Sequence, residues 1–158
     1  MSRNVLFVCT GNTCRSPLAA AMARQLAAAR GLDLTVSSAG TDASPGAPAS
    51  DGSMLVALER DLDLSTHRAR LLTRDLVAAA AVILGMAPQH VQQALALGGE
   101  GKAFLLADFA AREATDHAVH DPFGAGLDAY RHMADQLAAL MPAVLERLAG
   151  DSLAPELP

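Results

Sequence analysis

A short apolar run that ends in a compact loop and continues as an alanine-rich segment limits the folds open to this chain. The run Val5–Val8 has the length of a buried strand, and residues 16–30 have the composition of a helix. Three further apolar runs follow, each separated from the previous one by a helical stretch. Strands that alternate with helices form a parallel sheet whose crossover helices cover its faces. The pattern therefore predicts an α/β fold with four parallel strands.

The apolar periodicity also predicts where these elements begin and end. The predicted strands are Asn4–Val8, Leu34–Ser38, Ala80–Gly85 and Lys102–Leu106. The predicted helices are Ser16–Arg30, Ala49–Leu62, Pro88–Leu97 and Leu127–Leu148, with a short helix capped by Thr73. Residues 41–48, 64–72 and 108–126 are expected to be irregular, and the last of these loops is long enough to be functional. Pro142 should kink or divide the final helix, because proline has no N–H to donate.

The loop after the first predicted strand carries a pattern typical of anion chemistry. Its sequence is Cys-Thr-Gly-Asn-Thr-Cys-Arg-Ser-Pro, residues 9–17, with five residues between Cys9 and Arg15. A thiolate and a tetrahedral oxyanion both need N–H donors and positive potential, which a helix N-terminus and a guanidinium supply. Gly11 is expected to turn with positive φ, and Asn12 tolerates the left-handed region. The loop is predicted to hold a nucleophilic cysteine against a phosphoryl group.

The two cysteines of this loop are open to other interpretations. The spacing between a cysteine and an arginine is a weak signal by itself, and both Cys9 and Cys14 could be buried apolar thiols or half of a metal site. A zinc site is disfavoured, because the cysteine spacing and a distal pair of ligands do not fit the usual arrangement. His117 and His120 form a pair without an evident third ligand. We therefore expect no metal and no cofactor.

The chain resembles the low-molecular-weight protein tyrosine phosphatase family from about Asn4 to about Leu148. The similarity rests on the loop just described and on the run Asp-Pro-Phe-Gly at residues 121–124. Weaker similarities lie at residues 38–40, 67–70 and 82–86. The resemblance implies a single-domain, three-layer sandwich with a Rossmann-like phosphatase fold and a twisted sheet of strand order 2-1-3-4. The domain is expected to span residues 1–150, with a frayed tail at residues 151–158.

The resemblance also implies roles for individual residues. Cys9 would be the nucleophile that forms a phosphocysteine, Arg15 would bind the phosphoryl group, and Asp121 would act first as general acid and then as general base. The phosphate-binding loop would comprise Thr10, Gly11, Asn12, Thr13, Cys14 and Ser16, with Ser38 and His67 as its hydrogen-bonded support. Ser16 could donate its hydroxyl to the sulfur. Cys14 would be the redox partner of the nucleophile, capturing its oxidised form as a disulfide.

Two positions bear on the substrate that the resemblance implies. Thr13 and the single aromatic Phe123, followed by Gly124, are similar to the bacterial protein-arginine-phosphatase branch of the family. The alternative is a phosphotyrosine-protein phosphatase with the same mechanism. An arsenate reductase is a remote alternative, because such an enzyme needs cysteines after Cys14 and the chain has none. A binding module without catalysis is disfavoured, since nucleophile, arginine, serine and acid are all present.

Composition limits the partners of the chain. The net charge of −5 argues against general nucleic-acid binding. No apolar run reaches the length of a membrane span, and the N-terminus lacks the features of a signal peptide. With only two cysteines, both in the loop, a disulfide scaffold is excluded, so a cytoplasmic location is expected. The expected partners are phosphorylated proteins, with inorganic phosphate as product, and the protein is expected to be a monomer.

Overall fold

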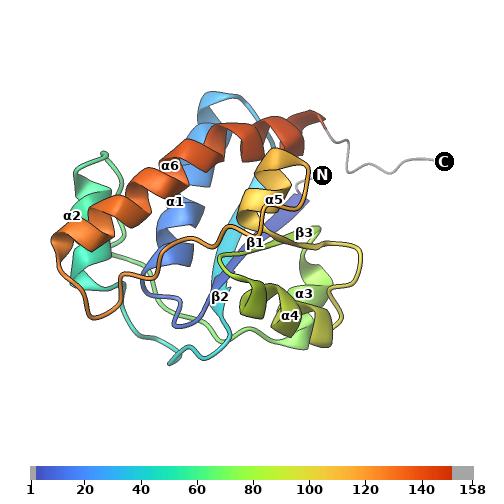
Figure 1. Ribbon diagram of the computed structural model, residues 1–158, viewed down its shortest axis with the longest axis horizontal. Helices are drawn as coiled ribbons and strands as arrows, with labels where there is room; N and C mark the ends of the chain where they lie inside the picture. Colours follow the sequence, from blue (N-terminus) through green and yellow to red (C-terminus); the bar gives the residue numbers. More distant parts are fainter. Residues whose placement is uncertain (1–2, 151–158) are drawn as a thin grey trace.

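A four-stranded parallel sheet forms the centre of the structure, a computed structural model that describes residues 3–150 (Figure 1). The strands are β1 (Arg3–Cys9), β2 (Leu34–Gly40), β3 (Val82–Gly85) and β4 (Ala103–Leu105). Their order is β2-β1-β3-β4, and each neighbouring pair is parallel. The predicted α/β fold with this strand order is confirmed. The predicted tail at residues 151–158 lies outside the described residues.

Side chains of β1 alternate between two apolar cores, one on each face of the sheet. Val5 and Phe7 belong to the larger core, and Leu6 and Val8 belong to the smaller one. This alternation follows from the two-residue period of a strand. The helices that contribute to the larger core are α1 (Arg15–Ala29), α2 (Asp51–Leu58), α5 (Leu106–Ala111) and α6 (Leu127–Gly150). Helices α3 (Arg74–Ala79) and α4 (Pro88–Ala96) cover the opposite face, which gives three layers (Figure 1).

Two predicted boundaries lie several residues from the observed ones. The loop expected from Asp108 begins only at Arg112, because Leu106 and Phe109 pack into the core as one face of the short helix α5. Helix α2 ends at Leu58 and not at Leu62. Its C-terminus is closed by the N–H of Leu62, which donates to the carbonyl of Ala57.

Pro142 lies inside α6 and does not divide the helix. Proline removes one intrahelical hydrogen bond. The neighbouring side chains Met141, Val144 and Leu145 are fully buried, so packing against the core holds the helix together across this gap. Thr73 caps α3 as predicted, with its hydroxyl accepting from the N–H of Leu76 at 3.2 Å.

The topology places the loop after β1 at the switch in strand order. β1 lies between β2 and β3, so the connection after β1 leads to one side of it and the connection after β2 leads to the other. In open α/β sheets, ligands bind at the carboxyl ends of the strands at such a point. The loop that contains Cys9 therefore occupies the position where this fold binds ligands. Within residues 3–150, no helix has both the length and the apolar character needed to cross a bilayer.

Candidate active site

The loop between β1 and α1 is a tight turn whose unusual backbone lies at Asn12. Asn12 has φ of 57° in the left-handed region, whereas Gly11 does not have a positive φ. The expectation that Gly11 supplies the positive φ is therefore wrong. Asparagine tolerates this region better than most residues, and its side chain can hold the turn through local hydrogen bonds.

A closed network of hydrogen bonds fixes the Asn12 turn. The Asn12 amide nitrogen donates to the hydroxyls of Ser16 at 2.8 Å and Ser38 at 2.9 Å, and its amide oxygen accepts from the N–H of Arg70 at 2.9 Å. His67 Nε2 donates to the carbonyl of Asn12 at 2.7 Å. Burial lowers the pKa of His67, against the effect of this hydrogen bond. Asn12 is fully buried with its amide satisfied, and such surroundings can hold a strained backbone in place.

The same network leaves the hydroxyl hydrogen of Ser16 available to the sulfur of Cys9. Ser16 Oγ accepts from Asn12, so its own hydrogen is free to point elsewhere. The sulfur of Cys9 lies 2.8 Å from this oxygen. The arrangement allows the sulfur to accept this hydrogen, which suits a thiolate better than a thiol. Both groups are buried at the base of the loop.

Backbone donors and Arg15 surround the space above the sulfur. Within residues 3–150, the N–H groups of residues 11–14 donate to no protein acceptor. Helix α1 begins at Arg15 with neither a side-chain cap nor an acidic residue in its first turn. Unpaired N–H groups at a helix N-terminus bind anions. The Arg15 guanidinium is almost fully buried, and one of its nitrogens donates to the carbonyl of Val119 at 3.2 Å.

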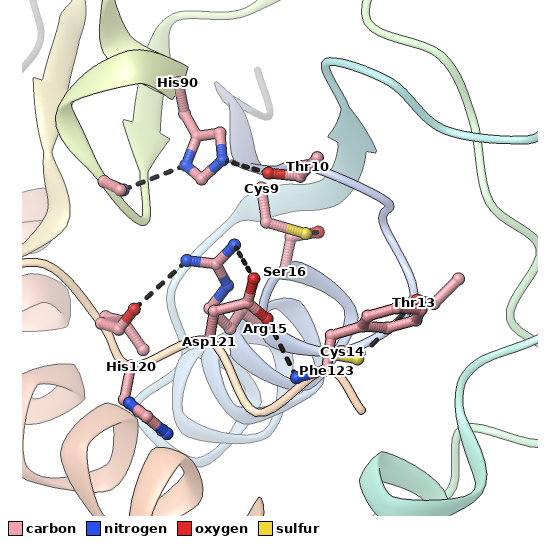
Figure 2. Close-up of polar contacts among 12 residues, drawn as sticks. Cys9, Thr10, Thr13, Cys14, Arg15, Ser16, His90, His120, Asp121 and Phe123 are labelled. Carbon is pink, nitrogen blue, oxygen red and sulfur yellow. Dashed lines mark hydrogen bonds and ion pairs between the residues drawn. The ribbon is translucent and has the colours of Figure 1, made fainter. Parts of the chain in front are cut away.

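The loop at residues 112–126 brings Asp121 to the same place. Val119 anchors this loop, because its N–H donates to the carbonyl of Met86 at 2.8 Å and its side chain is buried. Two residues later, Asp121 Oδ2 lies 3.6 Å from an Arg15 nitrogen, and Oδ1 accepts from the N–H of Phe123 at 3.1 Å. The Asp121 side chain is 54% exposed, so it can reach a bound molecule. Figure 2 shows Asp121 beside Arg15, opposite the sulfur of Cys9.

Asp108 has a different role in this part of the structure. Its Oδ1 accepts from the N–H and hydroxyl of Thr115, at 2.7 and 2.6 Å, and from the N–H of Asp116 at 3.3 Å. These hydrogen bonds lower the pKa of Asp108, against its partial desolvation. The carboxylate thus ties the start of the loop to α5. It does not line the pocket that Asp121 lines.

Residues of the Cys9 loop and of the loop at residues 112–126 together form the wall of one pocket of about 170 Å³. The residues that line it are Cys9, Thr10, Gly11, Thr13, Cys14, Arg15, Asp121 and Phe123. The remaining sequence-predicted site residues do not line the pocket: Asn12 and Ser16 belong to the loop, and Ser38 and His67 hold it through Asn12. Within residues 3–150, no group of three or more His, Cys, Asp or Glu side chains is arranged to hold a metal ion.

Sequence reasoning missed several residues that contact the loop. The sulfur of Cys14 lies 3.2 Å from Ser50 Oγ and 3.6 Å from the hydroxyl of Tyr130 on α6. Ser53 donates to the carbonyl of Cys14 at 3.1 Å. His90 on α4 contacts Thr10. Each partner is distant in the sequence, and isolated serine, tyrosine or histidine residues within helices or next to them carry no signal of their own.

A methyl group at Gly40 is expected to damage the loop. The Cβ of an alanine would lie 2.9 Å from the backbone nitrogen of Asn12 and press on the carbonyl of Thr10. Backbone atoms held by this network cannot move aside easily. We expect Gly40→Ala to lower the free energy of unfolding by about 1–3 kcal/mol, as overpacking commonly does, and to reduce kcat/KM for an aryl phosphate. Thermal denaturation and steady-state kinetics measure the two effects.

Gly150→Ala is the matched control, since nothing lies within 4 Å of the added methyl there. It should leave both stability and turnover close to those of the wild type. A Gly40→Ala protein with unchanged melting temperature and kcat/KM would show that the loop does not depend on this close approach.

Comparison with known proteins identifies relatives of this chain. The sequence model of the low molecular weight phosphotyrosine protein phosphatases matches residues 4–153. The protein-arginine-phosphatase of Bacillus subtilis (strain 168) is 35% identical over 150 residues, covering 94% of this chain and 98% of that protein. The low molecular weight protein-tyrosine-phosphatase PtpB of Staphylococcus haemolyticus (strain JCSC1435) is 35% identical over 138 residues, covering 87% and 94%.

A solved structure agrees in fold over nearly the whole chain. It is a mutant of the YwlE arginine phosphatase with a phosphorylated active-site serine. Its TM-score is 0.89 at 34% identity, and the match covers 96% of this chain and 99% of that one. In that protein, therefore, an active-site residue accepts a phosphoryl group covalently.

Proposed function

The chain belongs to the low molecular weight phosphotyrosine protein phosphatase family, and from this premise we propose that it hydrolyses phosphoarginine in proteins through a phosphocysteine at Cys9. The observation that carries the proposal is the single pocket that holds Cys9, Arg15 and Asp121 together above unpaired N–H groups. A nucleophile, an anion site and a proton donor within one pocket are the groups that phosphoryl transfer through a covalent intermediate requires.

In the first step, the thiolate of Cys9 attacks the phosphorus atom and the bond from phosphorus to the leaving group breaks. The phosphoryl oxygens are bound by the N–H groups of residues 11–14 and by Arg15, which stabilise the charge that develops on them. Asp121 donates a proton to the departing nitrogen. The substrate leaves as a neutral guanidine side chain that is protonated again by solvent, and the phosphoryl group stays on the sulfur.

In the second step, water attacks the phosphorus atom and the sulfur–phosphorus bond breaks. Asp121, now a carboxylate, accepts a proton from the water. The sulfur departs as a thiolate, and Ser16 Oγ at 2.8 Å stabilises it by donating its hydrogen. Inorganic phosphate is released, and both Cys9 and Asp121 return to their starting protonation states.

The wall of the pocket supports arginine over tyrosine as the residue that carries the phosphoryl group. Thr13 lines the pocket where a bulky aliphatic side chain would narrow it, and among the residues that the structure describes Phe123 is the one aromatic side chain that lines it. A phenyl ring gains from aromatic walls on both faces. A guanidinium substrate needs one apolar wall and a nearby carboxylate, which Phe123 and Asp121 supply. The relatives include both protein-arginine and protein-tyrosine phosphatases at similar identity, so overall similarity does not decide between the two substrates. The lining of the pocket favours arginine.

Cys14 is proposed to protect the nucleophile from irreversible oxidation by forming a disulfide with Cys9. Both cysteines are free thiols in the structure, and the sulfur of Cys14 would have to leave Ser50 and Tyr130 to form this bond. Two free thiols in the pocket suit a reducing compartment, and we propose a cytoplasmic location on this ground. The arsenate reductase alternative is not favoured, because the 158-residue chain has no cysteine after Cys14.

Substrate preference is tested with matched phosphoarginine and phosphotyrosine peptides. The wild type is expected to prefer the phosphoarginine peptide in kcat/KM. Replacing Thr13 by isoleucine narrows the pocket near Cys14 and is expected to reduce this preference by about tenfold or more, the scale that one or two methyl groups reach in a pocket. Steady-state phosphate release for the four combinations of enzyme and peptide measures the change.

Thr13→Ser serves as the control, since it keeps the hydroxyl and removes only a methyl group. This variant should retain the preference of the wild type. Equal or better turnover of the phosphotyrosine peptide by the wild type would contradict arginine specificity and leave the phosphatase mechanism intact.

A further inference from the structure

His90 is a fully buried histidine that the mechanism above does not use. It lies in the first turn of α4, behind the loop, and its two ring nitrogens have different partners. Nδ1 accepts from the backbone N–H of Ala87 at 3.0 Å, and Nε2 lies 2.8 Å from the hydroxyl oxygen of Thr10. Figure 2 shows the His90 ring with a dashed line from it to Thr10, next to Cys9.

The contact with Ala87 determines the tautomer of His90. A backbone N–H can only donate, so Nδ1 must be unprotonated to accept from it. A neutral imidazole then carries its hydrogen on Nε2. An imidazolium would place an N–H against the Ala87 N–H. Burial, together with the nearby charge of Arg15, lowers the pKa of His90 to about 4, although Asp121 acts in the opposite direction. The neutral form with Nε2–H is therefore the form that fits this site at neutral pH.

This tautomer decides what the hydroxyl of Thr10 can do. Nε2–H donates, so the Thr10 oxygen is the acceptor and its hydrogen points elsewhere. The backbone of Thr10 is also fixed, because its carbonyl accepts from the N–H of Asp42 at 2.9 Å. Thr10 lines the pocket beside Cys9. Its hydroxyl hydrogen is left for an anion bound above the sulfur.

We propose that His90 is a positioning residue, which holds Thr10 as a hydrogen-bond acceptor so that the Thr10 hydroxyl donates to the phosphoryl group in the pocket. The inference rests on the proposed function and adds one side-chain donor to the backbone donors of the loop. It parallels the opposite side of the loop, where Asn12 donates to Ser16 and leaves the Ser16 hydrogen for the sulfur of Cys9.

Two substitutions separate this role from a purely structural one. In His90→Asn, the amide oxygen replaces Nδ1 and can still accept from Ala87, but the side chain is too short to reach Thr10. In His90→Gln, the amide nitrogen replaces Nε2 and can donate to Thr10, while the contact with Ala87 is lost. If His90 only caps α4, asparagine should preserve function. If His90 positions Thr10, glutamine should preserve it.

The expected results are measured by orthovanadate binding and by kcat/KM for an aryl phosphate. His90→Asn should weaken vanadate binding and lower kcat/KM by about fivefold, the scale of one hydrogen bond, whereas His90→Gln should stay within about twofold of the wild type. Thr10→Val should resemble His90→Asn. The Thr10→Val/His90→Asn double variant should lose no more than either single variant, because both remove the same donor.

Several results would overturn the inference. These are a functional His90→Asn with a defective His90→Gln, full activity in both variants, or additive losses in the double variant. If both variants fail, the double variant decides between the two roles. Nitrogen-15 NMR of the histidine rings should show the Nε2–H tautomer for His90, and an Nδ1–H tautomer would contradict it. Vanadate affinity and the tautomer are measured without turnover. A wild type that hydrolyses neither the phosphoarginine nor the phosphotyrosine peptide would therefore reject the proposed function and leave the inference about His90 testable.

Discussion

Cys9→Ser is expected to abolish turnover of an aryl phosphate, with a loss of about 10⁴-fold or more, as removal of a catalytic nucleophile commonly causes. A hydroxyl at this position remains protonated at neutral pH and is a far weaker nucleophile than a thiolate. The rest of the pocket should remain, because the N–H groups of residues 11–14 and Arg15 do not depend on the sulfur. The variant should therefore still bind inorganic phosphate. Steady-state kinetics and phosphate titration test the two halves of this prediction.

The phosphorylated active-site serine of the YwlE mutant suggests a further readout. Incubation of Cys9→Ser with substrate should produce a stable phosphoprotein that intact mass spectrometry detects. Cys14→Ser is the matched control. Its oxygen can still hydrogen-bond to Ser50 and Tyr130, so it should keep turnover within about tenfold of the wild type. Undiminished hydrolysis by Cys9→Ser would remove the phosphocysteine from the mechanism.

The fold could be predicted from sequence because its signals are local and repeated. Each strand is a short apolar run, and β1 alternates between two cores as its period demands. The misplaced boundaries occur where tertiary packing decides. Leu106 and Phe109 form a helical face only because α6 lies against α5, and Pro142 stays within a helix because its neighbours are buried. A window of sequence contains neither of these partners.

The pocket residues predicted from the sequence come from one continuous segment, residues 9–17, and one distant motif, residues 121–124. Cys9 and Arg15 follow each other in one loop, and their geometry follows from a strand that leads into a helix. The role expected of Gly11 was wrong, because the hydrogen bonds that stabilise the left-handed turn converge on Asn12. His90 could not be found from sequence, since its relation to Thr10 depends on a contact across 80 residues.

Asp121→Asn is expected to lower kcat on a phosphoarginine peptide by about 10²–10⁴-fold, the range for loss of a general acid–base group. The arginine side chain is a far weaker acid than a phenol, whose pKa is about 10. An unprotonated guanidine anion would be a far poorer leaving group, so the first step depends on proton donation. Asparagine keeps an oxygen for the Phe123 N–H and a similar shape, but it cannot transfer the proton.

The dependence on leaving group separates proton transfer from simple binding. With a nitrophenyl phosphate, whose phenolate leaves without a proton, the first step in Asp121→Asn should be much less impaired than with phosphoarginine. Hydrolysis of the phosphocysteine still needs a base, so rapid mixing should show a burst of nitrophenolate followed by slow turnover. Asp108→Asn is the control, because this side chain does not line the pocket and its hydrogen bonds are to residues 115 and 116. Equal losses on both substrates without a burst would mean that Asp121 binds or orders the loop, and another group would then have to supply the proton.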